Sequence, residues 1–176
     1  AQSLPANLTS ATLRAVNELC RRYHTAMVFS TATQPDFAAR GDLNWTPREI
    51  LPEHRELFEA LRRVDVEWRL EHETPLEAIA EEMAEHDSVC TIVNLRRHAR
   101  NLFALLKEEG AAADGLFLLT TDLCPAHRLA VVEEIKRRQK QGLPCLVVAT
   151  QCIEAGVDLD FDVMYRALAP MESIIQ

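Results

Sequence analysis

One apolar segment near the end of the chain constrains the fold more than any other feature. Residues Cys145–Ala149 are all apolar, which is typical of a strand inside a parallel sheet. Directly after this segment come Thr150 and Gln151, followed by the string Glu154–Asp158, which holds a glycine between two carboxylates. Ligands of open α/β sheets bind at the carboxyl ends of the strands. The segment therefore predicts a parallel α/β fold with a ligand site at one edge of the sheet.

Short apolar runs and helical patterns alternate through the second part of the chain. The segment Val64–Leu70 alternates apolar and polar residues, which predicts a strand. Thr74–Glu77 has the pattern of a capping box that opens a helix, with Pro75 at the first helical position. The expected elements that follow are a strand at Ser88–Val93, a helix at Leu95–Glu109, a strand at Leu116–Leu119, a helix from Pro125 to about Gln139, and strands at Leu143–Ala149 and Val163–Ala167. This alternation predicts a mostly parallel sheet with helices on both faces.

The first 53 residues have a different organisation. Apolar residues at helical spacing predict a helix over about residues 10–23, and Ala26–Ser30 has the pattern of a short strand. Residues 36–53 contain one glycine and two prolines and have weak periodicity, which predicts a connector. We therefore expect residues 1–53 and 54–176 to belong to different domains.

Composition narrows the classes of function. Apolar residues make up 48% of the 176 residues, which supports a buried core. The net charge of −8 argues against a broad basic surface for nucleic acid, but it allows a narrow groove that follows phosphates. We find neither an apolar window long enough to span a membrane nor a signal-peptide pattern. The five cysteines lie far apart without a C-x-x-C pair, which argues against a zinc site and favours the reduced thiols of a cytoplasmic protein.

Polar segments follow three more of the expected strands. They are Thr31-Ala32-Thr33 after the first strand, Asn94 after Ser88–Val93, and Thr120-Thr121 at the start of a string that runs through Cys124-Pro125 to His127-Arg128. Each has an ordinary structural interpretation: a polar turn for the first segment, a helix N-cap for Asn94, and a loop leading into a helix for the two threonines.

In chain order, these segments resemble motifs III, IV and V of the superfamily 2 helicases. The strings 124–128 and 149–176 resemble, more specifically, the CRISPR-associated helicase-nucleases of the type I interference systems. Ala1-Gln2 resembles the end of a DEAQ box, and Gln176 resembles the first residue of motif VI. The resemblance implies a RecA-like parallel sheet. Residues 1–53 would be the C-terminal part of a first RecA-like domain with a connector, and residues 54–176 a second RecA-like domain, incomplete at its end.

The resemblance also implies roles for individual residues. The residues that bind ATP or couple it to movement would be Thr31, Ala32, Thr33, Gly156, Asp158 and Gln176. The residues that contact nucleic-acid phosphates would be Asn94, Thr120, Thr121 and Thr150. Plainer alternatives remain open, since Gly156 can simply supply a positive φ, Asp158 can cap a turn, and Thr150 can tie its own loop together.

The chemistry of ATP hydrolysis needs parts that these residues do not supply. The glycine-rich phosphate cradle, the Asp-Glu pair that holds Mg²⁺ and the arginine finger are not found in the 176 residues. We therefore expect no catalytic residue and no metal site in the chain, and no ATP hydrolysis by the chain alone.

The function implied by the resemblance is part of an ATP-dependent single-stranded DNA translocase in CRISPR interference, with ATP and Mg²⁺ as cofactors. Its partners would be single-stranded DNA, a crRNA-guided surveillance complex, the first RecA-like domain and a metal-dependent nuclease domain. Two alternatives stay open: another superfamily 2 DNA or RNA helicase, or a non-catalytic α/β interaction module. The string Glu154–Phe161 weighs against the DEAD-box RNA helicases.

Overall fold

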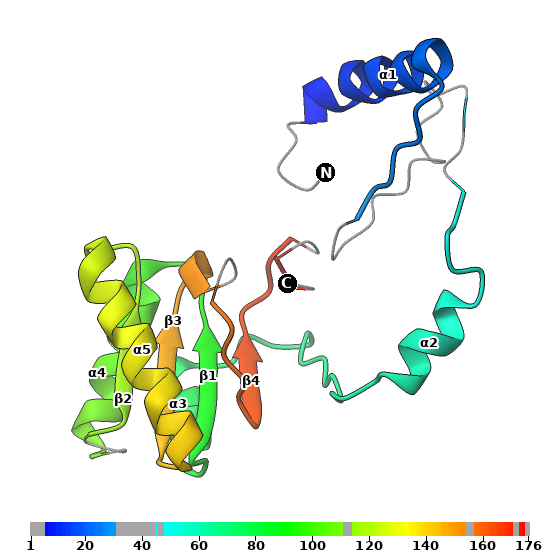
Figure 1. Cartoon of the computed structure of the whole chain (residues 1–176). Coiled ribbons are helices and arrows are strands. Elements are labelled where there is room, and N and C mark those ends of the chain that lie inside the picture. Colours follow the sequence, from blue (N-terminus) through cyan, green and yellow to red (C-terminus); the bar gives the residue numbers. More distant parts are fainter. Residues whose placement is uncertain are drawn as a thin grey trace. The chain divides into compact units, whose positions relative to one another are not determined.

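The chain divides into two compact units, Ala1–Arg69 and Leu70–Gln176 (Figure 1). The computed structural model describes residues 6–30, 45, 48–110, 114–153, 157–170 and 173–174. Each unit has its own secondary structure, so each is described by itself. The expected assignment of residues 1–53 and 54–176 to two RecA-like domains stays a prediction.

The first unit contains two helices, α1 (Ala6–Tyr23) and α2 (His54–Ala60). Helix α1 confirms the helix expected over residues 10–23, whereas α2 was not predicted. The strand expected at Ala26–Ser30 is wrong, because the described residues there form no strand. In that segment the ring of Phe29 instead stacks on Trp45, with the ring centroids 6.4 Å apart.

The strand expected at Val64–Leu70 is also wrong. Residues 62–70 have no regular secondary structure, and the four apolar side chains of the alternating pattern are each more than half exposed. Alternation produces a strand only where a neighbouring strand accepts its hydrogen bonds and a core covers one face. The described residues provide this segment with neither a neighbouring strand nor a core that covers one face.

The second unit is a parallel α/β domain. Its elements in chain order are α3 (Leu76–Ala84), β1 (Ser88–Ile92), α4 (Arg96–Glu108), β2 (Leu116–Leu119), α5 (Pro125–Gln141), β3 (Cys145–Ala149), the short 3₁₀ helix η1 (Gln151–Ile153) and β4 (Val163–Arg166). The strand order is β2-β3-β1-β4, and every neighbouring pair is parallel. This arrangement confirms the predicted α/β class and is consistent with a RecA-like fold.

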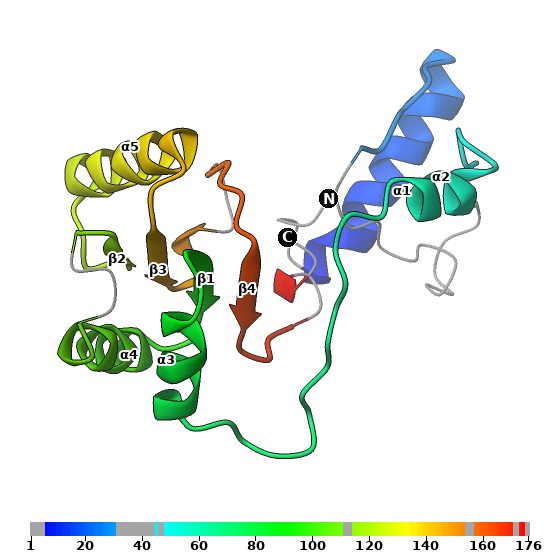
Figure 2. The same ribbon diagram turned by 90° about the horizontal axis from the view of Figure 1, so that it is seen from below.

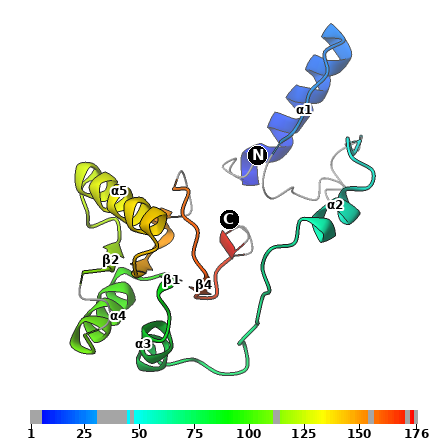
Figure 3. The same cartoon turned by 60° about the horizontal axis from the view of Figure 1, so that its bottom comes forward.

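Helices cover both faces of the sheet, as predicted. Helices α3 and α4 lie on one face and α5 on the other (Figures 2 and 3). Leu146 and Val148 of β3 pack with the α3 and α4 side chains, whereas Val147 packs with Ile135 of α5. All five residues of β3 are buried, which explains why this strand is apolar throughout.

One local prediction in this unit is wrong. Helix α3 has Pro75 as its N-cap and Leu76 as its first residue, and no side chain caps its N-terminus. Thr74 therefore lies one residue too early to act as the N-cap of a capping box.

Candidate nucleic-acid interface

The carboxyl ends of β1, β2 and β3 meet at one edge of the sheet because the three strands are parallel. Backbone hydrogen bonds continue past the strand ends: Val93 N–H donates to the Ala149 carbonyl at 2.9 Å, and Thr150 N–H donates to the Leu119 carbonyl at 3.0 Å. The polar segments after the strands are thereby held side by side.

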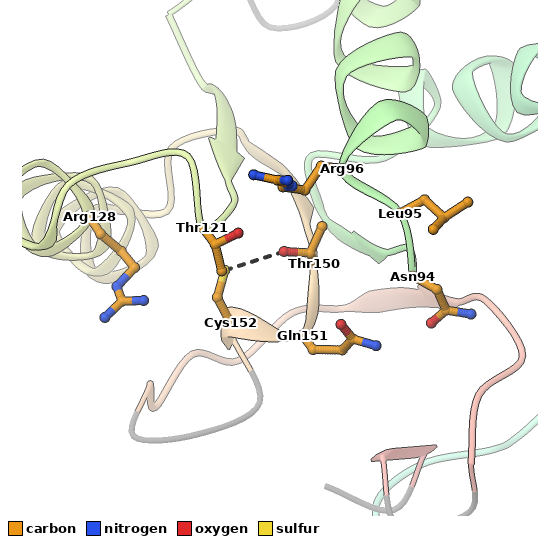
Figure 4. Close-up of a pocket in the computed structure, with 8 residues that line it drawn as sticks. All are labelled: Asn94, Leu95, Arg96, Thr121, Arg128, Thr150, Gln151 and Cys152. Carbon is orange, nitrogen blue, oxygen red and sulfur yellow. Dashed lines mark hydrogen bonds between the residues drawn. The ribbon is translucent and has the colours of Figure 1, made fainter.

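A cleft of about 650 Å³ lies at this edge (Figure 4). Its lining residues come from the ends of three strands and the starts of two helices: Asn94, Leu95, Arg96, Thr121, Arg128, Thr150, Gln151 and Cys152. Three of the four residues predicted to contact phosphates are among them, although they are up to 56 positions apart in sequence (150 − 94).

Thr150 lies at the end of β3, where the sequence placed it. Its residue is only 4% exposed, and its hydroxyl donates to Cys152 Sγ at 3.7 Å. Cys152 Sγ in turn donates to the Leu119 carbonyl at 3.2 Å, so the two strand ends are tied together. Sulfur is a weak acceptor, and a hydroxyl bonded to it can turn to a stronger acceptor in the cleft.

The two neighbouring threonines have different environments. Thr121 is exposed and lines the cleft. Thr120 is 1% exposed and is not among the lining residues. Its hydroxyl accepts from the Asp122 backbone N–H at 3.2 Å and donates to Asp122 Oδ2 at 3.3 Å. Thr121 therefore lies in the cleft, whereas the Thr120 hydroxyl stabilises the turn that follows β2.

Asn94 lines the cleft and also joins β1 to the segment after β4. Its Nδ2 donates to the Leu168 carbonyl at 2.6 Å, and its Oδ1 accepts from Arg166 Nη1 at 3.0 Å. The alternative in which Asn94 caps the following helix is wrong, because the N-cap of α4 is Leu95 and no side chain caps that helix. Asn94 is displaced from the N-cap by one residue.

Two arginines also line the cleft. The motifs in the sequence did not indicate a separate role for them. Arg96 is the first residue of α4, and Arg128 lies in the first turn of α5. Neither helix has a side-chain cap or an acidic residue in its first turn. Uncapped N–H groups and the positive end of the helix dipole favour an anion at such a position. Arginine in a first turn opposes that dipole, and this is the signal in the sequence that could have indicated a ligand-binding role.

The two arginines differ in what they contact. Arg96 Nη1 bonds to Asp122 Oδ1 at 2.6 Å, and Arg100 Nη2 bonds to Asp122 Oδ2 at 2.6 Å. The hydrogen bond from Arg100, followed by that from Arg96, holds the pKa of the Asp122 carboxyl below its usual value. Within the described residues, the Arg128 guanidinium makes no hydrogen bond or ion pair. Arg128 therefore presents an unneutralised charge to the cleft.

The residues predicted to bind ATP are mostly beyond what the structure describes. Thr31, Ala32, Thr33, Gly156 and Gln176 lie outside the described residues. Asp158 is described, is exposed and does not line the cleft. Its side chain makes no hydrogen bond to another described residue, so no turn-capping contact is seen there.

The described ranges contain no group of three or more His, Cys, Asp or Glu side chains placed to hold a metal ion. No helix among them combines the length and apolar content needed to cross a membrane.

The fold and the cleft together define a RecA-like α/β domain with a cationic, hydroxyl-rich strand edge. Residues 85–176, more than half of the chain and all of the cleft, match the family described as "CRISPR-associated nuclease/helicase Cas3, C-terminal". The chain belongs to this Cas3 family.

Archaeal relatives agree with the family. The chain is 27% identical over 138 residues to a putative CRISPR-associated nuclease/helicase Cas3 of Methanocaldococcus jannaschii, covering 76% of the chain and 18% of the relative. It is 30% identical over 107 residues to the Cas3 of Methanothermobacter thermautotrophicus, covering 61% and 12%. It is 38% identical over 52 residues to the Cas3 of Haloferax volcanii, covering 30% and 6%. The matches thus span less than a fifth of the length of these relatives.

Proposed function

We propose that this chain is part of an ATP-dependent single-stranded DNA translocase of CRISPR interference, and that the strand-edge cleft holds phosphates of the DNA. One observation carries the proposal. Arg96, Arg128, Thr121 and Thr150 converge on one cleft at the uncapped N-termini of α4 and α5. Guanidinium, hydroxyl and helix N-terminal N–H groups are the donors that proteins use for phosphates.

The chemistry of the lining favours the backbone of a nucleic acid over its bases. None of the eight described lining residues is aromatic, so no ring is present on which a base could stack. The donors are cationic or hydroxylic, and phosphate contacts position a strand without reading its sequence. A translocase needs this property, because it moves along any sequence.

The overall charge of −8 is compatible with this function. The local charge at the cleft is set by arginines within a few ångströms, whereas charges elsewhere on the surface are screened over about 10 Å in ordinary salt. A narrow cationic cleft on an acidic domain restricts the strand to one path. Binding is then weak enough overall to let the strand move on.

ATP and Mg²⁺ would act between this domain and a first RecA-like domain of the longer protein. Asp158 would accept a hydrogen bond from the ribose, and Gly156 would let the backbone approach the nucleotide. Thr31, Ala32 and Thr33 would couple the nucleotide to movement. The relatives are named CRISPR-associated nuclease/helicase; we propose accordingly that a nuclease domain and a crRNA-guided complex are partners.

The DNA-binding part is tested with the 176-residue chain and fluorescein-labelled single-stranded oligonucleotides, measured by anisotropy at several salt concentrations. Arg128→Gln should weaken binding equally for dT, dA and dC strands. It should also flatten the dependence of log K on log salt by about 0.7, the value for one phosphate contact on a single strand. RNA strands of the same sequences show whether the cleft prefers DNA.

Arg137→Gln is the matched control. Arg137 lies on the same helix as Arg128 but pairs with Glu134 and bonds to Gln141, about 13 Å further along the helix axis. It removes the same charge from the same element without touching the cleft. Equal losses for the two variants, or no measurable binding by the unaltered chain, would contradict the proposal.

A further inference from the structure

Asp122 directly follows the cleft residue Thr121 in the sequence, and it has no role in the proposed binding of phosphates. It belongs to the turn after β2, and its two carboxylate oxygens divide between two guanidinium groups of α4. Oδ1 accepts from Arg96 and Oδ2 accepts from Arg100, both at 2.6 Å. A single carboxylate therefore joins two cations that lie one helical turn apart.

The turn holds this carboxylate in place independently of the arginines. The Thr120 hydroxyl is buried, accepts from the Asp122 backbone N–H at 3.2 Å and donates to Oδ2 at 3.3 Å. The Asp122 side chain is 29% exposed, whereas the side chains of Arg96 and Arg100 are 60% and 61% exposed. The anion is thus the fixed partner, and the arginines are the ones free to exchange.

Arg96 belongs to both the ion pair and the cleft. It lines the same cleft as Thr121 (Figure 4). It uses only Nη1 toward Asp122, and its other guanidinium nitrogens make no hydrogen bond to a described residue. A carboxylate and a phosphodiester oxygen accept the same charge-assisted hydrogen bonds from arginine. A phosphate that reaches the cleft therefore meets an arginine that is already partly neutralised.

We propose that Asp122 is an internal counter-ion that competes with the strand phosphate for Arg96, and so limits how tightly the cleft holds a phosphodiester backbone. The inference rests on the proposed function, because that function supplies the phosphate. In this proposal Asp122 weakens the binding of the phosphate, in contrast to the residues that bind it. Such a residue suits a cleft that must release each phosphate for the strand to advance.

The competition has a measurable consequence. Asp122→Asn keeps the size and shape of the side chain and removes its charge. The variant should bind a single-stranded dT oligonucleotide about threefold to tenfold more tightly than the unaltered chain, since one exposed ion pair no longer opposes the phosphate. Its salt dependence should be steeper by up to about 0.7 in slope, because Arg96 then contributes a full phosphate contact.

The matched control is Glu134→Gln, which breaks another arginine–carboxylate pair at 2.6 Å on the same domain, away from the cleft lining. It changes net charge by the same amount, so it measures any long-range effect. In an Arg96→Gln background, Asp122→Asn should lose at least half of its gain. Thermal unfolding of all variants confirms that they are compared in the folded state.

Three results of the DNA measurements would overturn the inference: Asp122→Asn weakens binding, it matches Glu134→Gln, or its gain persists undiminished without Arg96. Inorganic pyrophosphate, titrated by NMR against the unaltered chain and Asp122→Asn, tests the same competition without DNA. If neither chain binds DNA, the proposed function fails by itself. The counter-ion role then stands if Asp122→Asn binds pyrophosphate more tightly, and falls if the two affinities are equal.

Discussion

Replacing Thr150 with valine separates its role in binding from its role in stability. Thr150 is a buried residue, and its hydroxyl donates a hydrogen bond to Cys152 Sγ at 3.7 Å. Losing a bond to such a weak acceptor costs less than the roughly 1 kcal/mol of an ordinary hydrogen bond. The added methyl group recovers about 0.8 kcal/mol of burial. The free energy of unfolding should therefore change by less than about 1 kcal/mol.

The effect on DNA binding should be larger. A hydroxyl that turns to a phosphate makes a charge-assisted hydrogen bond, and its loss costs about 1.5–3 kcal/mol, or about 10- to 100-fold in Kd. The loss should be the same for dT, dA and dC strands, because a phosphate contact carries no sequence information. Anisotropy and thermal unfolding are measured on the same preparation.

Thr91→Val is the matched control for this experiment. Thr91 is also a buried threonine whose hydroxyl donates to a sulfur, Met83 Sδ at 2.9 Å, but it lies within β1 and does not line the cleft. Its replacement should leave DNA affinity unchanged. A lower melting temperature for Thr150→Val with unaltered Kd would refute the phosphate contact and favour the alternative in which Thr150 only ties its own loop together.

Three further predictions concern the core, the thiols and the nucleotide. Leu102→Ala should destabilise the chain by about 2–5 kcal/mol in urea unfolding, because Leu102 is fully buried between α4 and the sheet; a loss below 1 kcal/mol would contradict that packing. Burial raises the pKa of the Cys90 thiol to about 12, so it stays protonated at pH 8. Iodoacetamide should modify the exposed Cys124 and spare Cys90, as mass spectrometry would show. In the longer protein proposed above, Asp158→Ala should raise the KM for ATP about tenfold or more, because it would remove the charge-assisted bond to the ribose that we propose for Asp158; a normal KM with weakened DNA affinity would reverse the assignment.

The sequence predicted the second unit well because its two central strands, β1 and β3, are buried on both faces. A run such as Cys145–Ala149 has no polar face, and five such residues in succession are typical of a strand inside a parallel sheet. The strand prediction for Val64–Leu70 is wrong because an alternating pattern shows only that a segment can form a strand. The pattern does not show that a neighbouring strand is there to pair with it. Without a neighbouring strand among the described residues, the tendency produces no strand.

The candidate site was predictable in part, for the same reason. Parallel strands bring their carboxyl ends together. Asn94, Thr121 and Thr150 each lie just after the end of such a strand, so the sequence alone was enough to place them at one edge. The ion pair between Arg96 and Asp122 was not predictable, since it joins residues from the starts of two different crossover connections. This ion pair forms only if α4 lies close to the turn after β2, and no local sequence pattern predicts that distance.

A crystal structure of the chain with a bound dT oligonucleotide tests the proposed phosphate binding most directly. We expect phosphates in the strand-edge cleft, within hydrogen-bond distance of Thr121, Thr150 and the Arg128 guanidinium, with the bases facing away from the lining. A strand bound on another surface with this cleft empty, or a base inserted into the cleft, would contradict the proposal.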